Sequence, residues 1–443
     1  MLTAFVRAFQ TPDLRKKLLI TLGLIALFRF GASLPTPGIS EKNVAFCSNL
    51  ATSASSSSAG VLAIVNLLSG QALLRLSVFA LGIMPYITAS IILQLLTVVI
   101  PRLETLKQEG QAGQAKITQY TRYLTVGLAL LQSTGYVELA RSGTLFNGCG
   151  ASGTANPLIP NASTFTIATM VITMVAGTTV IMWMGELITD RGVGNGMSVL
   201  IFTTVISVIP GEILAIYRIK GAFYAAIAIL VVVAIVAFIV FMEQAQRRIP
   251  VQYAKRMVGR RMYGGTSTYI PMKVNQAGVI PVIFASSLLY IPTLAAQLFG
   301  SQNNPQGWVA WISRYIEQSN SPFYMLAFFL LIVGFTYFYV SITFNPTEVA
   351  DNMKKYGGFI PGIRPGRPTA EYLQYVLSRL TAPGSVYLGI IALFPLLALS
   401  AAGVANQFPF SGVSLLIMVG VGLDTVKQIE SQLQQRNYEG FLR

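Results

Sequence analysis

Side chains that carry out chemistry are scarce in this sequence. Its 443 residues include no histidine and only two cysteines, Cys47 and Cys149. Histidine is the usual acid–base group near neutral pH and a common metal ligand, and these two cysteines lack metal-site spacing. The sequence also has no serine-nucleophile motif and no carboxylate pair within an apolar stretch. We therefore expect no enzyme activity, no bound metal and no cofactor.

Basic side chains form the other chemically informative group. The 31 Lys and Arg exceed the 16 Asp and Glu, and many of them gather in residues 243–273 and 345–379. Long basic segments broken by turns can dock an RNA or an acidic protein. The alternative is anionic-lipid contact combined with the ordinary excess of positive charge on cytoplasmic loops. We favour docking because these loops are longer than membrane topology requires.

The elements that position these loops are expected to lie in a membrane. Hydrophobic residues make up 53% of the chain and charged residues 11%, whereas a soluble domain usually carries about 25% charged residues. Too little charge remains to cover a water-facing surface. A large soluble protein with an apolar core is the alternative, but the apolar residues come in blocks of membrane length.

Ten charge-poor intervals predict an all-α polytopic membrane protein with ten transmembrane helices. They are residues 18–39, 76–101, 120–139, 164–185, 192–211, 221–242, 276–299, 318–347, 383–403 and 410–428. With this assignment, 24 of the 31 Lys and Arg fall on the side of the two termini and 5 on the opposite side. Positive charge collects on the cytoplasmic side, so both termini are predicted to be cytoplasmic.

A repeated motif predicts two related halves. Residues 82–90 and 278–286 both fit G-x-x-P-x-I-x-A-S, and the two stretches would run in opposite directions across the membrane. This is the pattern of two inverted five-helix halves, here 1–218 and 219–443, with a pathway between them. A proline within each helix would free a carbonyl group and allow a bend. Small and hydroxyl side chains after it suit either a seam that opens or a tight permanent interface.

Two predicted external features have two readings each. The apolar stretch 61–70 is too short to span a membrane, so it is either a re-entrant, pore-plugging helix or a helix lying on the surface. Cys47 and Cys149 fall in loops on the same external side. They either form a disulfide or share that side by chance. The predicted spans also lack the central carboxylates that ion-coupled transporters use.

Several short motifs, in order along the chain, resemble the SecY family, the central subunits of the protein-conducting channel. The resemblance covers nearly the whole chain, and its most specific stretches are residues 80–87, 119–123, 190–196, 246–250, 344–346 and 361–366. It implies an hourglass channel that translocates unfolded secretory polypeptides and releases transmembrane segments sideways into lipid. A small-solute transporter and an intramembrane enzyme are the rival classes.

The resemblance implies a ring of apolar side chains at the waist of the channel. Its members here would be Ile83, Ile87, Ile201, Ile283 and Ile417. Such a ring would exclude water and ions, yet part around a chain of any sequence. The repeat independently puts Ile87 and Ile283 at equivalent positions.

The resemblance also implies a plug, a lateral gate and docking residues. The plug would be residues 61–70, with apolar side chains Val61, Leu62, Ile64, Val65, Leu67 and Leu68. The gate would lie between spans 2–3 and 7–8, at Thr88, Ser90, Ser286 and Ser287. Partners would dock on Arg256, Arg260, Arg261 and Arg364.

The partners and location that the resemblance implies are equally specific. They are the smaller subunits SecE and SecG, the SecA motor ATPase and/or the ribosome, signal sequences and unfolded preproteins, and membrane lipid. The expected location is the inner (plasma) membrane, with the thylakoid membrane as a further site if the source is photosynthetic.

Overall fold

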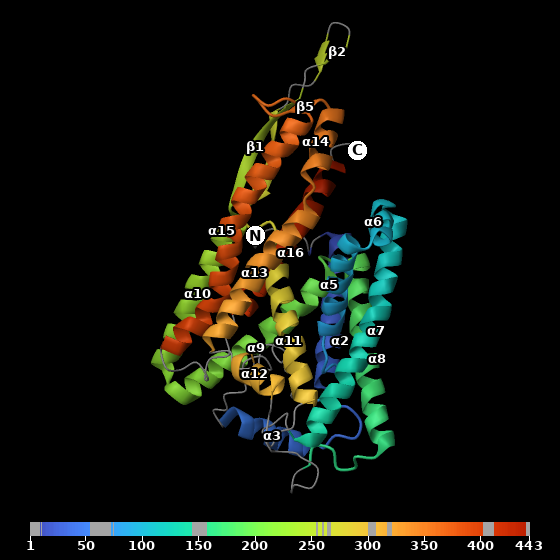
Figure 1. The fold of residues 1–443 in the computed structure, drawn as a ribbon, viewed down its shortest axis with the longest axis vertical. Helices are drawn as coiled ribbons and strands as arrows, with labels where there is room; N and C mark the ends of the chain where they lie inside the picture. The colour runs from blue at the N-terminus through green and yellow to red at the C-terminus, as the bar shows by residue number, and fades with distance from the viewer. Residues whose placement is uncertain are drawn as a thin grey trace.

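The protein is a long bundle of helices with a β-hairpin projecting from one end (Figure 1). The computed structural model describes residues 9, 11–53, 72–73, 75–143, 157–253, 256–258, 261–263, 267–299, 307–316, 321–401 and 412–439. Each of the ten predicted intervals contains a helix. These helices are α2 (Pro12–Ser33), α5 (Met84–Val99), α7 (Gln111–Ser142), α8 (Thr164–Arg191), α9 (Gly196–Lys220), α10 (Ala222–Gln244), α11 (Ile280–Phe299), α13 (Pro322–Thr343), α15 (Arg367–Ala401) and α16 (Gly412–Glu439).

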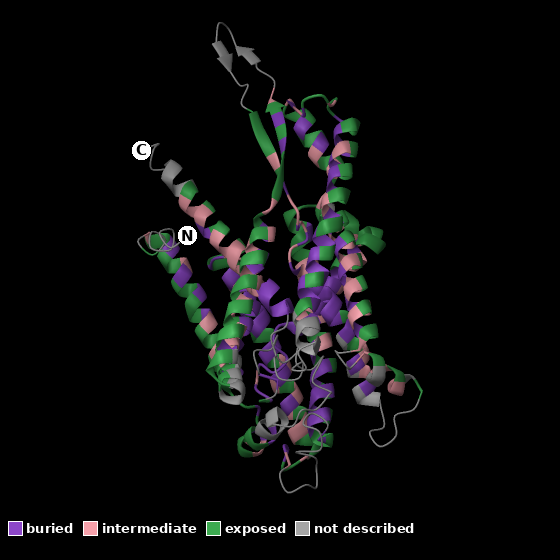
Figure 2. Cartoon of the chain, turned by 90° about the vertical axis from the view of Figure 1, so that its left-hand side faces the viewer, coloured by how far each residue is buried: buried purple, intermediate pink, exposed green. Residues whose placement is uncertain are grey.

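Several of these helices have the length and hydropathy of membrane spans. Among the described residues, α8, α10, α13, α15 and α16 qualify, and α5 with α6 (Pro101–Gln108) forms a sixth candidate bent by 105°. Their outer faces are apolar and exposed, as on α10, where Phe223 and Phe241 are more than 70% exposed. Figure 2 shows buried residues in the middle of the bundle and exposed ones along its outer faces. The count of ten spans and the side of the termini stay predictions.

The repeated motif marks two helix starts rather than two bends. Gly82 and Gly278 have positive φ values of 55° and 63°, a conformation that glycine adopts without a steric penalty. Helices α5 and α11 begin two residues later, so Pro85 and Pro281 lie in their first turns. Proline is tolerated there because the first N–H groups of a helix have no intrahelical partner. The interpretation of these prolines as sites of a mid-helix bend is therefore wrong.

The second predicted span starts later than its charge-free interval. Residues 76–83 form turns instead of helix, and they are largely buried. Irregular backbone is tolerated at membrane depth only where protein surrounds it. Here Leu76 O accepts a hydrogen bond from Thr36 N at 3.1 Å and Val78 N donates to Leu34 O at 2.9 Å. The turns also fill space next to α8, where a Cβ at Gly177 would overlap the carbonyl oxygen of Val78.

The ten helices form two sets with the same order of neighbours. In the first set, α5 contacts α7, α7 contacts α8, α8 contacts α9, and α2 contacts α9. In the second, α11 contacts α13, α13 contacts α15, α15 contacts α16, and α10 contacts α16. The chain passes from one set to the other at Gly221, whose φ is 88°. Helix α9 runs through the predicted boundary at 218/219 and ends at Lys220.

The first basic loop contains an antiparallel hairpin that the all-α prediction missed. Strands β1 (Gln246–Tyr253) and β4 (Ser267–Lys273) pair along their length, and β2 (Arg256–Val258) pairs with β3 (Arg261–Tyr263) beyond them. From the second loop, β5 (Gly358–Phe359) pairs with β1, and α14 (Pro346–Lys355) lies beside it. Alternating apolar residues at 249, 251 and 253 were the overlooked signal for β1.

The opposite end of the bundle carries two short helices, α3 (Glu41–Ser53) and α12 (Trp308–Tyr315) (Figure 1). Cys47 lies in α3 and is disulfide-bonded. The disulfide reading of the sequence is thus the right one for Cys47, and Cys149, the other cysteine of the sequence, lies outside the described residues.

Gly177→Ala is expected to destabilise the protein by about 2 kcal/mol, because the new methyl group would displace the buried turn at Val78. Thermal unfolding in detergent measures this as a lower midpoint. The matched control is Gly127→Ala in α7, where a Cβ meets no atom within 4 Å. That change should be neutral or stabilise by up to about 1 kcal/mol. Equal midpoints for the two variants would contradict the packing argument.

Candidate functional site

The five isoleucines predicted as a ring belong to the large apolar core, which draws buried residues from all ten of the long helices. Ile83, Ile201, Ile283 and Ile417 are buried in it, and the half-buried Ile87 packs against it. They come from both sets of helices: Ile87 and Ile283 are each the fourth residue of their helix, α5 and α11. Isoleucine side chains neither donate nor accept hydrogen bonds, so these five can exclude water only by their apolar surface.

The described part of the chain shows no cluster of metal-ligating side chains. No group of three or more His, Cys, Asp or Glu side chains there could hold a metal ion. The arrangement that does stand out is the contact between the two helix sets, where α11 packs on α5 and α7.

The predicted gate residues lie on α5 and α11, two helices that pack against each other. Thr88 and Ser286 are buried, and each hydroxyl donates within its own helix, to Met84 O at 3.0 Å and to Ile283 O at 2.9 Å. Ser90 accepts from Gln94 Nε2 on the same helix at 3.3 Å. The buried Ser287 Oγ has no hydrogen-bond partner within the described residues. Separating α5 from α11 would therefore leave the hydrogen bonds of the first three hydroxyls intact.

Helix α11 is attached to its own set by larger side chains. Phe284 makes edge-to-face contacts with Phe335 and Tyr339 of α13, with ring centroids 5.9 Å and 6.3 Å apart. Such aromatic pairs contribute about 0.5–1.5 kcal/mol beyond their buried area. These ring contacts anchor α11 to α13. Sequence inspection passed over Phe284 because it looked like one apolar residue among many.

The predicted plug and part of the docking set cannot be placed. Residues 61–70 and Arg260 lie outside the described residues. Arg256 begins β2 and Arg261 begins β3, so the two lie on paired strands of the hairpin tip. Arg364 lies between β5 and α15, and its carbonyl oxygen accepts from Thr369 Oγ1 at 2.9 Å.

The two basic loops, predicted as separate elements, share one sheet. Its strand order is β4-β1-β5, with β5 supplied by the second loop. On its exposed surface the guanidinium of Arg248 stacks over the ring of Tyr269, 4.9 Å from the centroid. The side chain is held in place while its charge stays accessible to an anionic partner.

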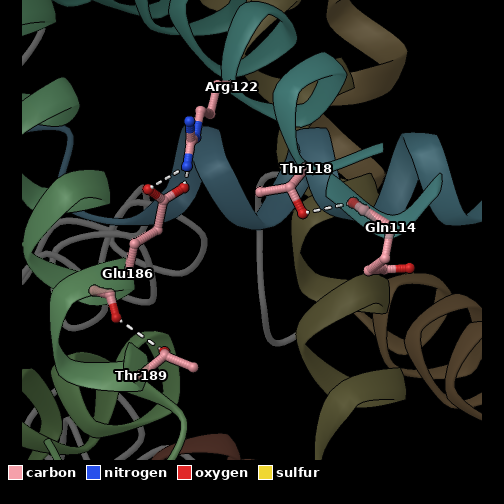
Figure 3. Close-up of polar contacts among 6 residues, drawn as sticks. Gln114, Thr118, Arg122, Glu186 and Thr189 are labelled. Carbon is pink, nitrogen blue, oxygen red and sulfur yellow. Dashed lines mark hydrogen bonds and ion pairs between the residues drawn. The ribbon is translucent and has the colours of Figure 1, made fainter. Parts of the chain in front are cut away.

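An ion pair that the sequence did not reveal joins α7 to α8. Arg122 Nε and Nη2 donate to the two carboxylate oxygens of Glu186, both at 2.8 Å (Figure 3). The two residues are 64 positions apart, so no local pattern could have paired them. Bidentate geometry makes this the strongest type of arginine–carboxylate contact. One helical turn along α8, Thr189 Oγ1 donates to Gly185 O and accepts from Gly196 N.

The motif at residues 190–196, which includes the turn between α8 and α9, packs against α2 and α16. Val193 N donates to Thr21 Oγ1 of α2 at 3.2 Å, and Val193 shares an apolar cluster with Ile429 of α16. Asn195 caps α9 by accepting from Met197 N at 3.1 Å. Gly194 has a φ of 88° and faces Thr425 of α16. This short motif therefore joins the two helix sets at the end of α8.

Solved structures with this fold define the class of protein. The chain superposes on a structure described as a protein-conducting channel with a TM-score of 0.63 and 17% identity, covering 94% of this chain and 92% of that one. It matches Sec61 from a canine ribosome–channel complex with a TM-score of 0.59 and 16% identity, over 94% and 92% of the two chains. The fold is that of protein-conducting channels of the membrane.

Sequence comparison gives the family. The SecY family model matches residues 77–426. Curated relatives named protein translocase subunit SecY are 63% identical in Streptomyces coelicolor and 57% identical in Mycobacterium tuberculosis, each over the full length of both chains. The chain belongs to the SecY family, and it is a membrane protein of the translocase channel class.

The coupling energy of the Arg122–Glu186 pair is expected to be about 1 kcal/mol, because its side chains are 47% and 22% exposed to solvent. Glu186→Gln and Arg122→Gln should each lower the unfolding midpoint, and the double variant should fall less than the sum of the two. The exposed Arg367–Glu371 pair is the control, and Glu371→Gln there should have little effect. Additive losses at Arg122 and Glu186 would mean that the pair contributes no coupling.

Proposed function

We propose that this chain is the central subunit of a protein-conducting channel, which translocates unfolded secretory polypeptides and releases transmembrane segments into lipid. One observation carries the proposal: α5 and α11 pack against each other and carry Ile87 and Ile283 at the same position, the fourth residue of each helix. A translocating chain presents every kind of side chain in turn. A passage lined by apolar groups with no fixed hydrogen-bond partners tolerates all of them.

The proposed ring consists of Ile83, Ile87, Ile201, Ile283 and Ile417. In the closed state these side chains touch one another and leave no room for a continuous file of water, so ions do not cross. When a polypeptide enters, they part and close around it. The apolar segment 61–70 is proposed to plug the external side of this ring, in accordance with its length and its position before α5.

The proposed lateral gate is the contact of α5 and α7 with α11. Helices in lipid gain no hydrophobic energy from meeting, so a contact made by small side chains is easily separated. Thr88, Ser90 and Ser286 keep their hydroxyl hydrogen bonds during separation because those bonds lie within single helices. A sufficiently apolar segment in the passage could then partition into lipid.

The proposed docking surface is the sheet β4-β1-β5 with its basic hairpin, including Arg256, Arg260, Arg261 and Arg364. Its charge suits RNA phosphates or acidic side chains, which fits the ribosome and/or the SecA motor as cytoplasmic partners. Structural relatives bound to ribosomes, such as the canine Sec61 complex and yeast Ssh1, support this assignment. We further propose SecE and SecG as companion subunits and the inner (plasma) membrane as the location.

Polar substitution in the proposed ring is expected to open an ion leak. Ile87→Ser or Ile283→Ser removes about 2 kcal/mol of apolar contact, which corresponds to about a 30-fold rise in the open fraction. Conductance across planar bilayers containing the purified channel measures the leak. Ile391→Ser is the matched control, since Ile391 is buried in the same cluster but lies on α15. If the ring variants conduct no more than this control, the ring assignment is wrong.

A stalled translocating polypeptide is expected to crosslink to cysteines placed at Ile87 and Ile283. A cysteine at Phe241, which is 71% exposed on the outer face of α10, should remain unreactive toward it. When the stalled chain carries a transmembrane segment, crosslinks should also appear from Ser90. Equal crosslinking from all positions would contradict a defined passage between the two helix sets.

A further inference from the structure

Buried polar side chains stabilise the short connection from the hairpin to α11, and the proposed function assigns them no role. Strand β4 ends at Lys273 and α11 begins at Ile280. Between them, Asn275 is 3% exposed, and on the facing helix Glu243, the penultimate residue of α10, is 8% exposed. Buried polar groups need partners, because an unpaired one costs about 1–3 kcal/mol.

Asn275 bridges three elements with one amide group. Its Nδ2 donates to Glu243 Oε1 at the end of α10 and to Gly278 O, at 3.2 Å, just before α11. The neighbouring Val274 N donates to Ala245 O at 3.0 Å, which extends the β1–β4 ladder to its last rung. The end of α10, the base of the hairpin and the start of α11 are therefore connected by consecutive hydrogen bonds.

Two glycines bring other helices against this connection. A Cβ at Gly384 of α15 would overlap the carbonyl oxygen of Val274. A Cβ at Gly420 of α16 would lie 2.7 Å from a methyl carbon of Val279, at the start of α11. The connection that leads into α11 is thus packed against α15 at Val274 and against α16 at Val279.

Charged neighbours surround Glu243 but do not replace its hydrogen bond. Lys273 lies nearby and pairs with Asp424 of α16 at 3.6 Å, and both of these side chains are exposed. Exposed pairs at this distance contribute little. The buried Glu243–Asn275 contact is therefore the firm one.

We propose that Glu243 and Asn275 are positioning residues that fix the base of the β1–β4 hairpin to the start of α11. A partner that binds the hairpin then moves α11 against α5 instead of bending the connection. This inference rests on the proposed function, in which the hairpin is the docking surface and the α5–α11 contact is the gate.

The test measures a distance between the hairpin and α11 directly, without any partner. Spin labels on Thr268→Cys in β4 and Leu288→Cys in α11 occupy exposed positions, and Cys47 cannot react because it is disulfide-bonded. Double electron–electron resonance in lipid nanodiscs should give one narrow distance for the otherwise unchanged protein. Glu243→Leu and Asn275→Leu should broaden and shift it.

Conservative variants separate positioning from general damage. Glu243→Gln keeps an acceptor for Asn275 Nδ2 and should retain the narrow distance. Asn275→Asp should broaden the distance distribution, because two carboxylates then face each other. Combining Asn275→Asp with Glu243→Gln should restore much of the narrow distribution. Lys273→Gln is the neighbouring control and should change nothing. A distance that stays narrow in Glu243→Leu and Asn275→Leu overturns the proposal.

A second measurement distinguishes this proposal from the proposed function. Labels on Val98→Cys in α5 and Leu288→Cys in α11 report the gate, and purified bacterial ribosomes are the added probe. Ribosomes should shift this distance in the otherwise unchanged protein and in Glu243→Gln, but bind without shifting it in Glu243→Leu. If ribosomes shift it equally in Glu243→Leu, the positioning role is refuted. If they neither bind nor shift it in any variant, ribosome docking fails while the first measurement still decides the positioning role.

Discussion

The proposed function depends on one physical constraint, which is that the contact between α5 and α11 must exclude water and yet be able to separate. Lipid tails are as apolar as the helices, so the hydrophobic effect does not press the two helix sets together. Close packing must hold them, and α5 and α11, which pack against each other, carry Ile87 and Ile283. Helix α11 is also tied to α13 by the rings of Phe284, Phe335 and Tyr339. The anchored α11–α13 contact supports the proposal that α11 separates from α5 rather than from α13.

Membrane physics explains why the sequence located the helices so well. Charges are excluded from hydrocarbon and the bilayer fixes a minimum length, so each charge-poor interval overlaps one of the ten long helices. The helix starts were less accessible, because Pro85 and Pro281 read equally well as bends or as first-turn residues. Only the backbone at Gly82 and Gly278 decides between these alternatives. The hairpin was not predicted, although apolar residues occupy every second position from 249 to 253. The many basic residues of this loop were interpreted by their charge and not by their periodicity.

The sequence predicted those residues of the candidate site that belong to the repeated motif. The motif put Ile87 and Ile283 at equivalent positions, and each is the fourth residue of its helix. Ile201 and Ile417 have no such signal and came from family resemblance alone. Contacts between distant residues, such as Arg122 with Glu186 or Glu243 with Asn275, were beyond reach. Nothing in the sequence near one partner specifies the other, and the fold alone brings them together.

Helices α5 and α11 begin in the same way, but different structures precede them in the chain. Before Gly82 the chain forms a buried turn that packs into the space at Gly177 of α8. Before Gly278 it forms the hairpin, whose last rung leads through Asn275 into α11. A shared helix start therefore joins α5 to the segment proposed as the plug and α11 to the surface proposed for docking. Because the two helices pack against each other, movement of either one would change the contact that the proposed ring seals. In the proposed function, this single contact therefore responds both to the plug and to a partner on the docking surface.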